Sequence, residues 1–129
     1  MQTIGCFNLT NEGGFVCAGE ISYIDSNGNS GKTDRYGYIN LGQSELMLPS
    51  DKGVQADWII QLYIDINGGN DRTGGTHFLY DPNSTACAHY RITGTTLNSE
   101  VHFDGITPTA DVKILVTPVE RSPRKTATG

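Results

Sequence analysis

The side chains in this sequence that most often serve catalysis or metal binding are three histidines and three cysteines. His77, His89 and His102 fall in three different segments with the period of β-strands. Together with Asp104, the last two have a spacing compatible with a zinc site or an acid–base pair but diagnostic of neither. Cys87 is close to His89, yet nothing around it indicates an activated thiol. We therefore expect unrelated surface histidines, no catalytic residue and no enzymatic activity.

Oxygen-bearing side chains alternate in the segment 25–31, whose order is Asp, Ser, Asn, Gly, Asn, Ser, Gly. Asp25, Asn27 and Asn29 stand at alternate positions, as the first ligands of an EF-hand calcium loop do. The glycine of such a loop at position six is replaced by Ser30, and the acid at position twelve by Tyr36. Because Asn–Gly is a favoured turn pair, a hairpin turn is the simpler interpretation. Calcium at the three alternating residues is the alternative, and we expect no other cofactor.

A second loop, at 67–75, is rich in glycine and follows a strongly apolar segment. Asp65, Asn67, Asn70 and Asp71 place carboxylate and amide oxygens along it. Such oxygens suit a hard cation or a polar ligand, although a solvated loop is the simpler interpretation. We take these four residues as candidate ligand-binding residues.

Tyrosine is the commonest aromatic residue in the chain, with six copies. A surface tyrosine offers a flat apolar ring and a hydroxyl, which suits sugar rings, lipid headgroups and protein partners. Tyrosine is also simply a good strand former. Tyr63, which leads into the 67–75 loop, and Tyr36 and Tyr38 complete the set of candidate ligand-binding residues.

The element that must position these side chains is the apolar segment 55–66, which contains the only tryptophan. Large apolar residues occupy every second position from Trp58 to Ile66, and Tyr63 and Asp65 have the opposite parity. A period of two is that of a strand with one buried face. We expect a central strand whose second face, running into the 67–75 loop, is the first place to look for a site.

The rest of the chain repeats this pattern in short pieces separated by turn residues, with no segment of helical period. The expected strands are 3–9, 15–24, 36–41, 44–48, 55–66, 76–80, 86–93, 100–103 and 111–119. The first two should form a hairpin across the Gly13–Gly14 turn. The chain is predicted to be all-β, a single-domain antiparallel β-sandwich of about eight to nine strands. The domain should span 1–120, and 121–129 should be a disordered basic tail.

The cysteine count is odd, which argues against an essential disulfide framework. Three reduced, buried thiols are the favoured interpretation for Cys6, Cys17 and Cys87. A single bridge between Cys6 and Cys17, on the first two expected strands, is the alternative.

Charge and hydropathy limit the partners and the location. The net charge of −5 and the pI near 4.9 disfavour nucleic acid, because an acidic surface repels phosphate backbones. No apolar run approaches the roughly 20 residues of a membrane-spanning helix, and the first residues do not form a signal peptide. We expect a protein that is not transmembrane, and that is cytoplasmic as made or secreted without a recognisable signal peptide.

Three segments together resemble small microbial β-sandwich proteins: 11–16, then 39–44 with Leu48 and Pro49, then 80–85 leading to 90–97. In size, acidity and strand content the chain is also similar in architecture to the aegerolysins, the small lipid-binding partners of pore-forming toxins. This resemblance implies a soluble lipid-binding protein of a toxin or defence system.

Two classes of function follow. The first is a non-enzymatic binding module for membrane lipid, glycan or a protein partner, which needs no catalytic constellation. The second is a structural β-sandwich protein that forms a homo-oligomer through exposed strand edges.

Overall fold

The computed structural model describes residues 1–108. The elements are β1 (Thr3–Ile4), β2 (Cys6–Asn11), β3 (Cys17–Ile24), β4 (Ser30–Lys32), β5 (Tyr38–Ile39), β6 (Ser44–Met47), the 3₁₀ turn η1 (Pro49–Lys52), β7 (Ile59–Ile66), β8 (Arg72–Tyr80), β9 (Ala86–Gly94) and β10 (Ser99–Pro108). The expected strand at 111–119 and the basic tail at 121–129 lie outside the described residues.

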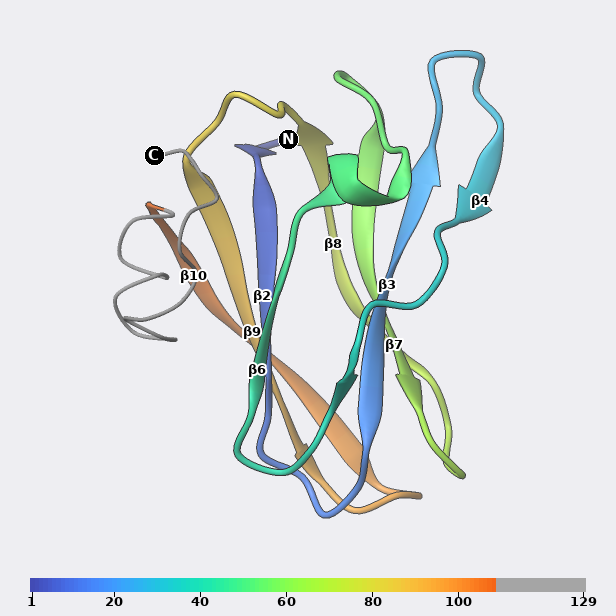
Figure 1. Ribbon diagram of the computed structural model, residues 1–129, viewed down its shortest axis with the longest axis vertical. Helices are drawn as coiled ribbons and strands as arrows, with labels where there is room; N and C mark the ends of the chain where they lie inside the picture. The colour runs from blue at the N-terminus through green and yellow to red at the C-terminus, as the bar shows by residue number, and fades with distance from the viewer. Residues whose placement is uncertain (109–129) are drawn as a thin grey trace.

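The strands form two sheets that pack face to face, and the all-β sandwich expected from the sequence is confirmed (Figure 1). Sheet A has the order β1-β8-β7-β3-β4, with β5 also paired to β3. Sheet B has the order β10-β9-β2-β6. Both sheets are mixed rather than purely antiparallel, because β1 runs parallel to β8 and β2 runs parallel to β9. None of the helical turns in residues 1–108 is long and apolar enough to cross a membrane.

The first expected strand is in fact divided between the two sheets. The chain leaves β1 in sheet A and enters β2 in sheet B at Gly5, whose amide donates to Ala86 O at 2.8 Å. A Cβ at Gly5 would lie 2.2 Å from Ser84 O, so only glycine allows this close approach of two backbones. The expected hairpin between the first two strands is therefore wrong: β2 and β3 lie in different sheets.

The central strand β7 lies between β8 and β3 and has the predicted alternation. Its residues Ile60, Leu62, Ile64 and Ile66 are buried in the core, and the residues between them are half-buried. Trp58 precedes β7 and is half-buried against Tyr23, with the ring centroids 4.9 Å apart. The predicted strand therefore begins too early, since Asp57 has a φ of 71°, which is incompatible with extended backbone.

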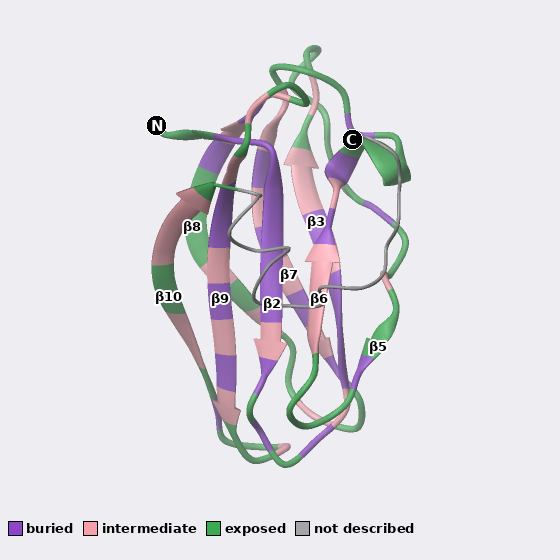
Figure 2. Cartoon of the chain, turned by 60° about the vertical axis from the view of Figure 1, so that its left-hand side comes forward, coloured by how far each residue is buried: buried purple, intermediate pink, exposed green. Residues whose placement is uncertain are grey.

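Aromatic rings from both sheets meet in the core. Phe7 on β2 contacts Phe78 at 5.8 Å and Tyr90 at 6.1 Å between ring centroids. The strand β2 is buried along most of its length, whereas β9 alternates between buried and half-buried residues (Figure 2). The core therefore lies between β2 and β9 on one side and β7 and β8 on the other.

The pairing of the cysteines differs from both sequence-based interpretations. Cys6 and Cys87 are opposite each other in the parallel β2–β9 pair, with Cα atoms 4.6 Å apart, and form a disulfide. Cys17 is the free cysteine of the described residues; it is buried, and burial raises the pKa of its thiol to about 11. Sequence spacing could not reveal the bridge, because it depends on which strands are neighbours.

Candidate functional site

The predicted site at Tyr63 and the following loop is present on the outer face of sheet A, but its groups bind one another. The Tyr63 hydroxyl donates to Asp71 Oδ2 at 2.5 Å, and the amide of Ile66 donates to Asp71 Oδ1 at 3.2 Å. The Tyr63 hydrogen bond lowers the pKa of Asp71, and the same bond raises the pKa of Tyr63 to about 12. These contacts close the loop after β7 and leave neither group poised for a ligand.

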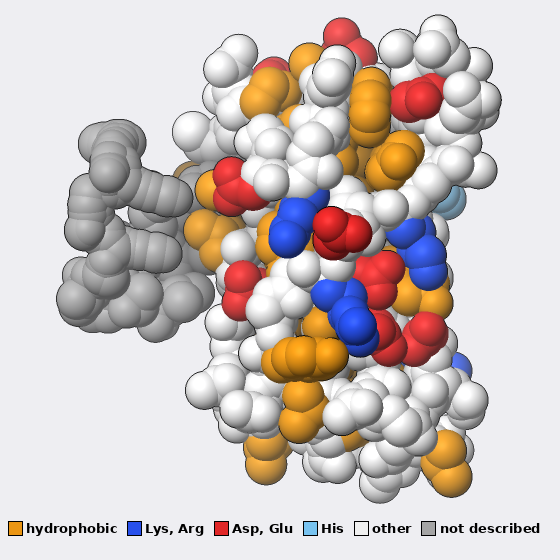
Figure 3. All heavy atoms as spheres, turned by 45° about the vertical axis from the view of Figure 1, so that its right-hand side comes forward, with side chains coloured by type: hydrophobic (Ala, Val, Ile, Leu, Met, Phe, Trp, Pro, Cys, Tyr) orange, Lys and Arg blue, Asp and Glu red, His pale blue; other side chains and the backbone are white. Residues whose placement is uncertain are grey.

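The other charges on this face are paired as well. Arg35 Nη1 lies 2.9 Å from Asp65 Oδ2, and Lys32 Nζ lies 3.8 Å from Glu20 Oε1. Lys32 Nζ also lies 3.7 Å from the centre of the Tyr63 ring. Acidic and basic side chains gather in the middle of this side of the molecule in Figure 3. The result is a self-neutralised patch rather than an open binding site.

The remaining predicted ligand-binding residues are dispersed. The Tyr36 hydroxyl donates to Leu48 O at 2.8 Å, and burial raises the pKa of Tyr36. Tyr38 is 61% exposed and lies beside sheet B. Asn67 and Asn70 are exposed, and the backbone amide of Asn67 donates to Val16 O. The structure thus brings together Tyr63, Asp65 and Asp71 but not these four.

The segment proposed as a calcium loop forms the turn between β3 and β4. Asp25 Oδ1 accepts hydrogen bonds from the amides of Asn27 and Asn29, both at 2.9 Å. These bonds give the Asp25 carboxylate a role in shaping the hairpin turn. No group of three or more His, Cys, Asp or Glu side chains within residues 1–108 is arranged to hold a metal ion.

The histidines do not converge. His89 Nε2 is 2.5 Å from Thr107 Oγ1, His102 Nε2 is 2.9 Å from Thr93 Oγ1, and His77 is exposed on sheet A. Burial lowers the pKa of His89, which keeps its ring neutral at pH 7. Because Cys87 is bonded to Cys6, its sulfur is not a free nucleophile beside His89.

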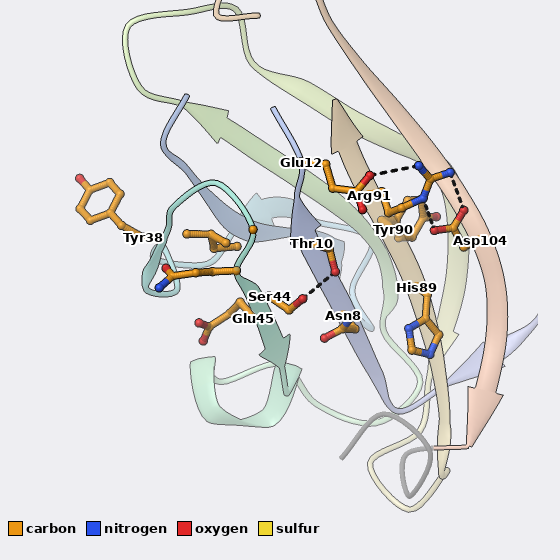
Figure 4. Close-up of a pocket in the computed structure, with 13 residues that line it drawn as sticks. Asn8, Thr10, Glu12, Tyr38, Ser44, Glu45, His89, Tyr90, Arg91 and Asp104 are labelled. Carbon is orange, nitrogen blue, oxygen red and sulfur yellow. Dashed lines mark hydrogen bonds and ion pairs between the residues drawn. The ribbon is translucent and has the colours of Figure 1, made fainter. Parts of the chain in front are cut away.

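A hollow on the outer face of sheet B has a volume of about 640 Å³ (Figure 4). Residues of β2, β6, β9 and β10 line it, together with β5 and the β5–β6 turn. They are Asn8, Thr10, Glu12, Tyr38, Ile39, Gly42, Gln43, Ser44, Glu45, His89, Tyr90, Arg91 and Asp104. We call this hollow the sheet B pocket; its lining is rich in amide, hydroxyl and charged groups.

The register of sheet B positions the polar groups of the pocket. Asn8 lies opposite His89, and Thr10 lies opposite Arg91, in the parallel β2–β9 pair. Thr10 Oγ1 is also 2.7 Å from Ser44 Oγ on the other side. Five polar side chains from neighbouring strands therefore point out of the same face, as Figure 4 shows.

Arg91 is held by two carboxylates. Its Nε lies 2.6 Å from Asp104 Oδ2 and its Nη2 lies 3.1 Å from Asp104 Oδ1, while Nη1 lies 3.3 Å from Glu12 Oε1. The β9–β10 register shifts between Phe103 and Gly105, and this bulge places the Asp104 carboxylate against Arg91. The guanidinium is thus fixed in orientation before any ligand arrives.

Two lining residues, Asn8 and Tyr90, each have a buried side-chain oxygen without a hydrogen-bond partner, and Asn8 is the one that lies on the outer face with the other polar groups of the pocket. The residue is 6% exposed, and its Oδ1 has no hydrogen-bond partner. A buried polar atom without a partner costs roughly 1–3 kcal/mol, so such atoms are rare in folded proteins. The pocket therefore contains an acceptor that a ligand donor would satisfy.

Sequence reasoning missed this site, although part of its signal was present. His89 and Arg91 have the same parity on one expected strand, and Asn8 and Thr10 have the same parity on another. The missing information was that β2 and β9, separated by more than seventy residues, are parallel neighbours.

Comparisons with known proteins leave the family open. No family model matches the chain, and no curated protein, the aegerolysins included, matches it. Among solved structures, the crystal structure of listeriolysin O covers 78% of this chain at 19% identity, with a TM-score of 0.41. A structure described as a trapped toxin covers 78% at 13% identity, with the same TM-score. The chain spans 22% and 23% of their lengths, and likeness at this level assigns no function.

Proposed function

We propose that this protein is a non-enzymatic binding module that holds a neutral, hydroxyl-rich ligand of the glycan class in the sheet B pocket. The observation that carries the proposal is the unpartnered Oδ1 of Asn8, which is buried against a hollow of about 640 Å³. A sugar hydroxyl is a donor of the right size to reach such an acceptor.

The other lining groups favour the same ligand class. Thr10 and Ser44 offer hydroxyls, Gln43 offers an amide, and the exposed ring of Tyr38 offers a flat surface. Sugars are held by such hydrogen-bonding groups beside an aromatic ring. A pocket for a hydrocarbon chain would instead have a predominantly apolar lining.

Charge argues against an anionic ligand. Glu12, Glu45 and Asp104 contribute carboxylates to the lining, and Arg91 contributes its single guanidinium. Since His89 is held neutral by burial, the pocket has a negative balance at pH 7. A phosphate or a carboxylated sugar would be repelled by the carboxylates, whereas a neutral sugar would not.

The binding assignment also fits the state of the reactive groups. Cys87 is in a disulfide, His89 is hydrogen-bonded to Thr107, and Arg91 is held by its two carboxylates. A nucleophile and a base within reach of one another would favour an enzyme instead. We expect binding without turnover and without a cofactor, so a calcium chelator should leave it unchanged.

Self-assembly through strand edges is a weaker candidate. The edge strands β1 and β4 of sheet A have two and three residues, and β10 carries a bulge. Short and bulged edges are poor templates for pairing with another chain. Light scattering over a range of protein concentrations should show a constant mass, and a concentration-dependent oligomer would favour the alternative.

The test is a glycan array followed by titration of the best neutral glycan into wild type and Asn8→Leu. The substitution keeps the volume of the side chain and removes the amide, so binding should fall at least tenfold while the melting temperature is retained. Gln61→Leu makes the same amide-to-leucine change on the outer face of sheet A and should bind as wild type does. Unchanged binding by Asn8→Leu, or no glycan bound at all, would rule out the proposal.

A further inference from the structure

The two ends of the sandwich differ in charge. Three turns lie at the end drawn at the bottom of Figure 1: residues 40–43 between β5 and β6, 67–70 between β7 and β8, and 95–98 between β9 and β10. No residue of these turns is Asp, Glu, Lys or Arg. We call this the uncharged end.

Two of the charged residues next to these turns are already bonded within the protein, whereas Glu100, two residues after the third turn, has a side chain that is 80% exposed and lies 3.8 Å from His102 Nε2. Asp71 follows the second turn, and its carboxylate accepts hydrogen bonds from Tyr63 and from the amide of Ile66. Glu12, in the β2–β3 connection at the same end, is paired with Arg91. The turn surfaces themselves thus present only neutral groups.

The opposite end is acidic. Its connections carry Asp25, Asp51, Asp57 and Asp81, against one lysine, Lys52. In Figure 3 acidic side chains appear at the upper end, while the lower end is mostly uncharged and carries separate hydrophobic side chains. Within residues 1–108, the aspartates of these connections therefore lie away from the three uncharged turns.

Two leucines project from the uncharged end. Leu41 in the first turn is 65% exposed, and Leu97 in the third is 63% exposed. Turn tips are normally occupied by polar residues, and single exposed leucines are common. These two leucines lie at the same end of the sandwich, on turns without charge that are separated by β2 in sheet B, and together they give this end two apolar points of contact.

The turns are held in place by the rest of the protein. The buried side chain of Asn11 donates to Phe15 O at 2.6 Å and to Ile39 O at 2.9 Å, and its backbone oxygen accepts from Gly42 at 2.7 Å. The Gly14 amide donates to Gly94 O at 3.0 Å, which ties the β9–β10 turn to the same frame. Turns whose backbone is already held in this way lose little backbone entropy on binding.

We propose that the uncharged end docks on a lipid surface with zwitterionic headgroups, with Leu41 and Leu97 entering the boundary between headgroups and acyl chains. Burying a leucine there is favourable, and the neutral turns carry no charge that must be desolvated. The aspartates at the far end point away from the bilayer in this orientation. Anionic lipid should weaken the docking, because the acidic protein is repelled by a negative leaflet.

The experiment is sedimentation with vesicles of synthetic phosphatidylcholine, which carry no sugar. Wild type should bind, Leu41→Asp and Leu97→Asp should each bind about tenfold more weakly, and the double variant should not sediment. Leu97 is the cleaner site, since its turn does not line the sheet B pocket. Asn83→Asp places the same charge on an exposed residue at the acidic end and should bind as wild type does.

A second measurement reports the orientation. Trp58 lies at the acidic end, so vesicles should leave its emission unchanged, whereas a tryptophan introduced by Leu97→Trp in a Trp58→Phe background should shift to the blue. Asn8→Leu should sediment with vesicles as wild type does, which separates this inference from the glycan proposal. The inference is overturned if wild type does not bind, if the leucine variants bind normally, or if Asn83→Asp binds as weakly as they do.

Discussion

The two outer faces of the sandwich differ in whether their polar side chains find partners within the protein. On sheet A, Tyr63 is bonded to Asp71, Arg35 is paired with Asp65, and Lys32 lies between Glu20 and the Tyr63 ring. On sheet B, polar groups surround a hollow in which a buried acceptor is left without a partner. A cluster of polar and aromatic side chains is therefore a candidate binding site only when some of its hydrogen-bonding groups have no partner within the protein.

Among the changes considered, loss of the disulfide should have the largest effect on stability. Both of its cysteines lie in sheet B. Reduction of Cys6–Cys87 should lower the free energy of unfolding by about 2–4 kcal/mol, because the bridge closes a loop of 81 residues in the unfolded chain. The measurement is denaturant unfolding with and without a reductant. Thiol titration of the oxidised, unfolded protein should find one free thiol, Cys17, and a count of three would contradict the bridge.

The second largest effect on stability is expected from a comparison of two buried asparagines of β2. Asn11 fills its side-chain bonding capacity with Phe15 O, Ile39 O and the amide of Gly13, whereas Asn8 leaves Oδ1 unpartnered. Asn11→Ala should lower the free energy of unfolding by about 3 kcal/mol, because it leaves several buried backbone groups without a hydrogen-bond partner. Asn8→Leu should change it by less than about 1 kcal/mol. Equal losses in urea unfolding would mean that Asn8 has a structural partner.

A smaller effect tests the self-neutralised patch on sheet A. Tyr63→Phe should lower the free energy of unfolding at pH 7 by up to about 1 kcal/mol, since the bond is exposed. The folded-state pKa of Asp71 is depressed, so this stability is present above the unfolded pKa near 4 and is lost as the pH falls through the folded value. Unfolding series at pH 7 and pH 3 should show wild type and variant converging at the lower pH.

The smallest effect is a pH dependence specific to sheet B. Burial depresses the folded pKa of His89, so its neutral form contributes stability that is present above the unfolded pKa near 6.5 and is lost as the pH falls through the folded value. Between pH 7 and pH 5, the free energy of unfolding should therefore fall by a few tenths of a kcal/mol less in His89→Gln than in wild type. Identical melting profiles for the variant and wild type over that range would contradict it.

Much of the fold was predictable from local patterns. The alternation along β7 and the turn residues between short apolar segments are properties of neighbouring residues, and the structure confirms the all-β sandwich. The pattern did not show that Asp57 would take positive φ and delay the strand, or that Asp104 would lie in a bulge within β10. Both depend on contacts with partner strands.

The candidate site was predictable only in part. Tyr63, Asp65 and Asp71 do lie together, as the sequence suggests, but their mutual bonds were not visible in it. The sheet B pocket needs β2, β6, β9 and β10 side by side, and β2 and β9 pair in parallel across a long separation in the chain. Residue types and parity say which side chains share a face of one strand, and nothing about which strand lies next to it.

By itself, the sequence determined the strand periods, the turns, the acidic balance and the absence of charge in three turns, since these depend on residues close together in the chain. Tertiary structure alone decided that Cys6 pairs with Cys87, that Asn8 faces a hollow, and that the three turns meet at one end. The physical reason is that strand neighbours are chosen by burial of the whole core, which no local window of the chain contains.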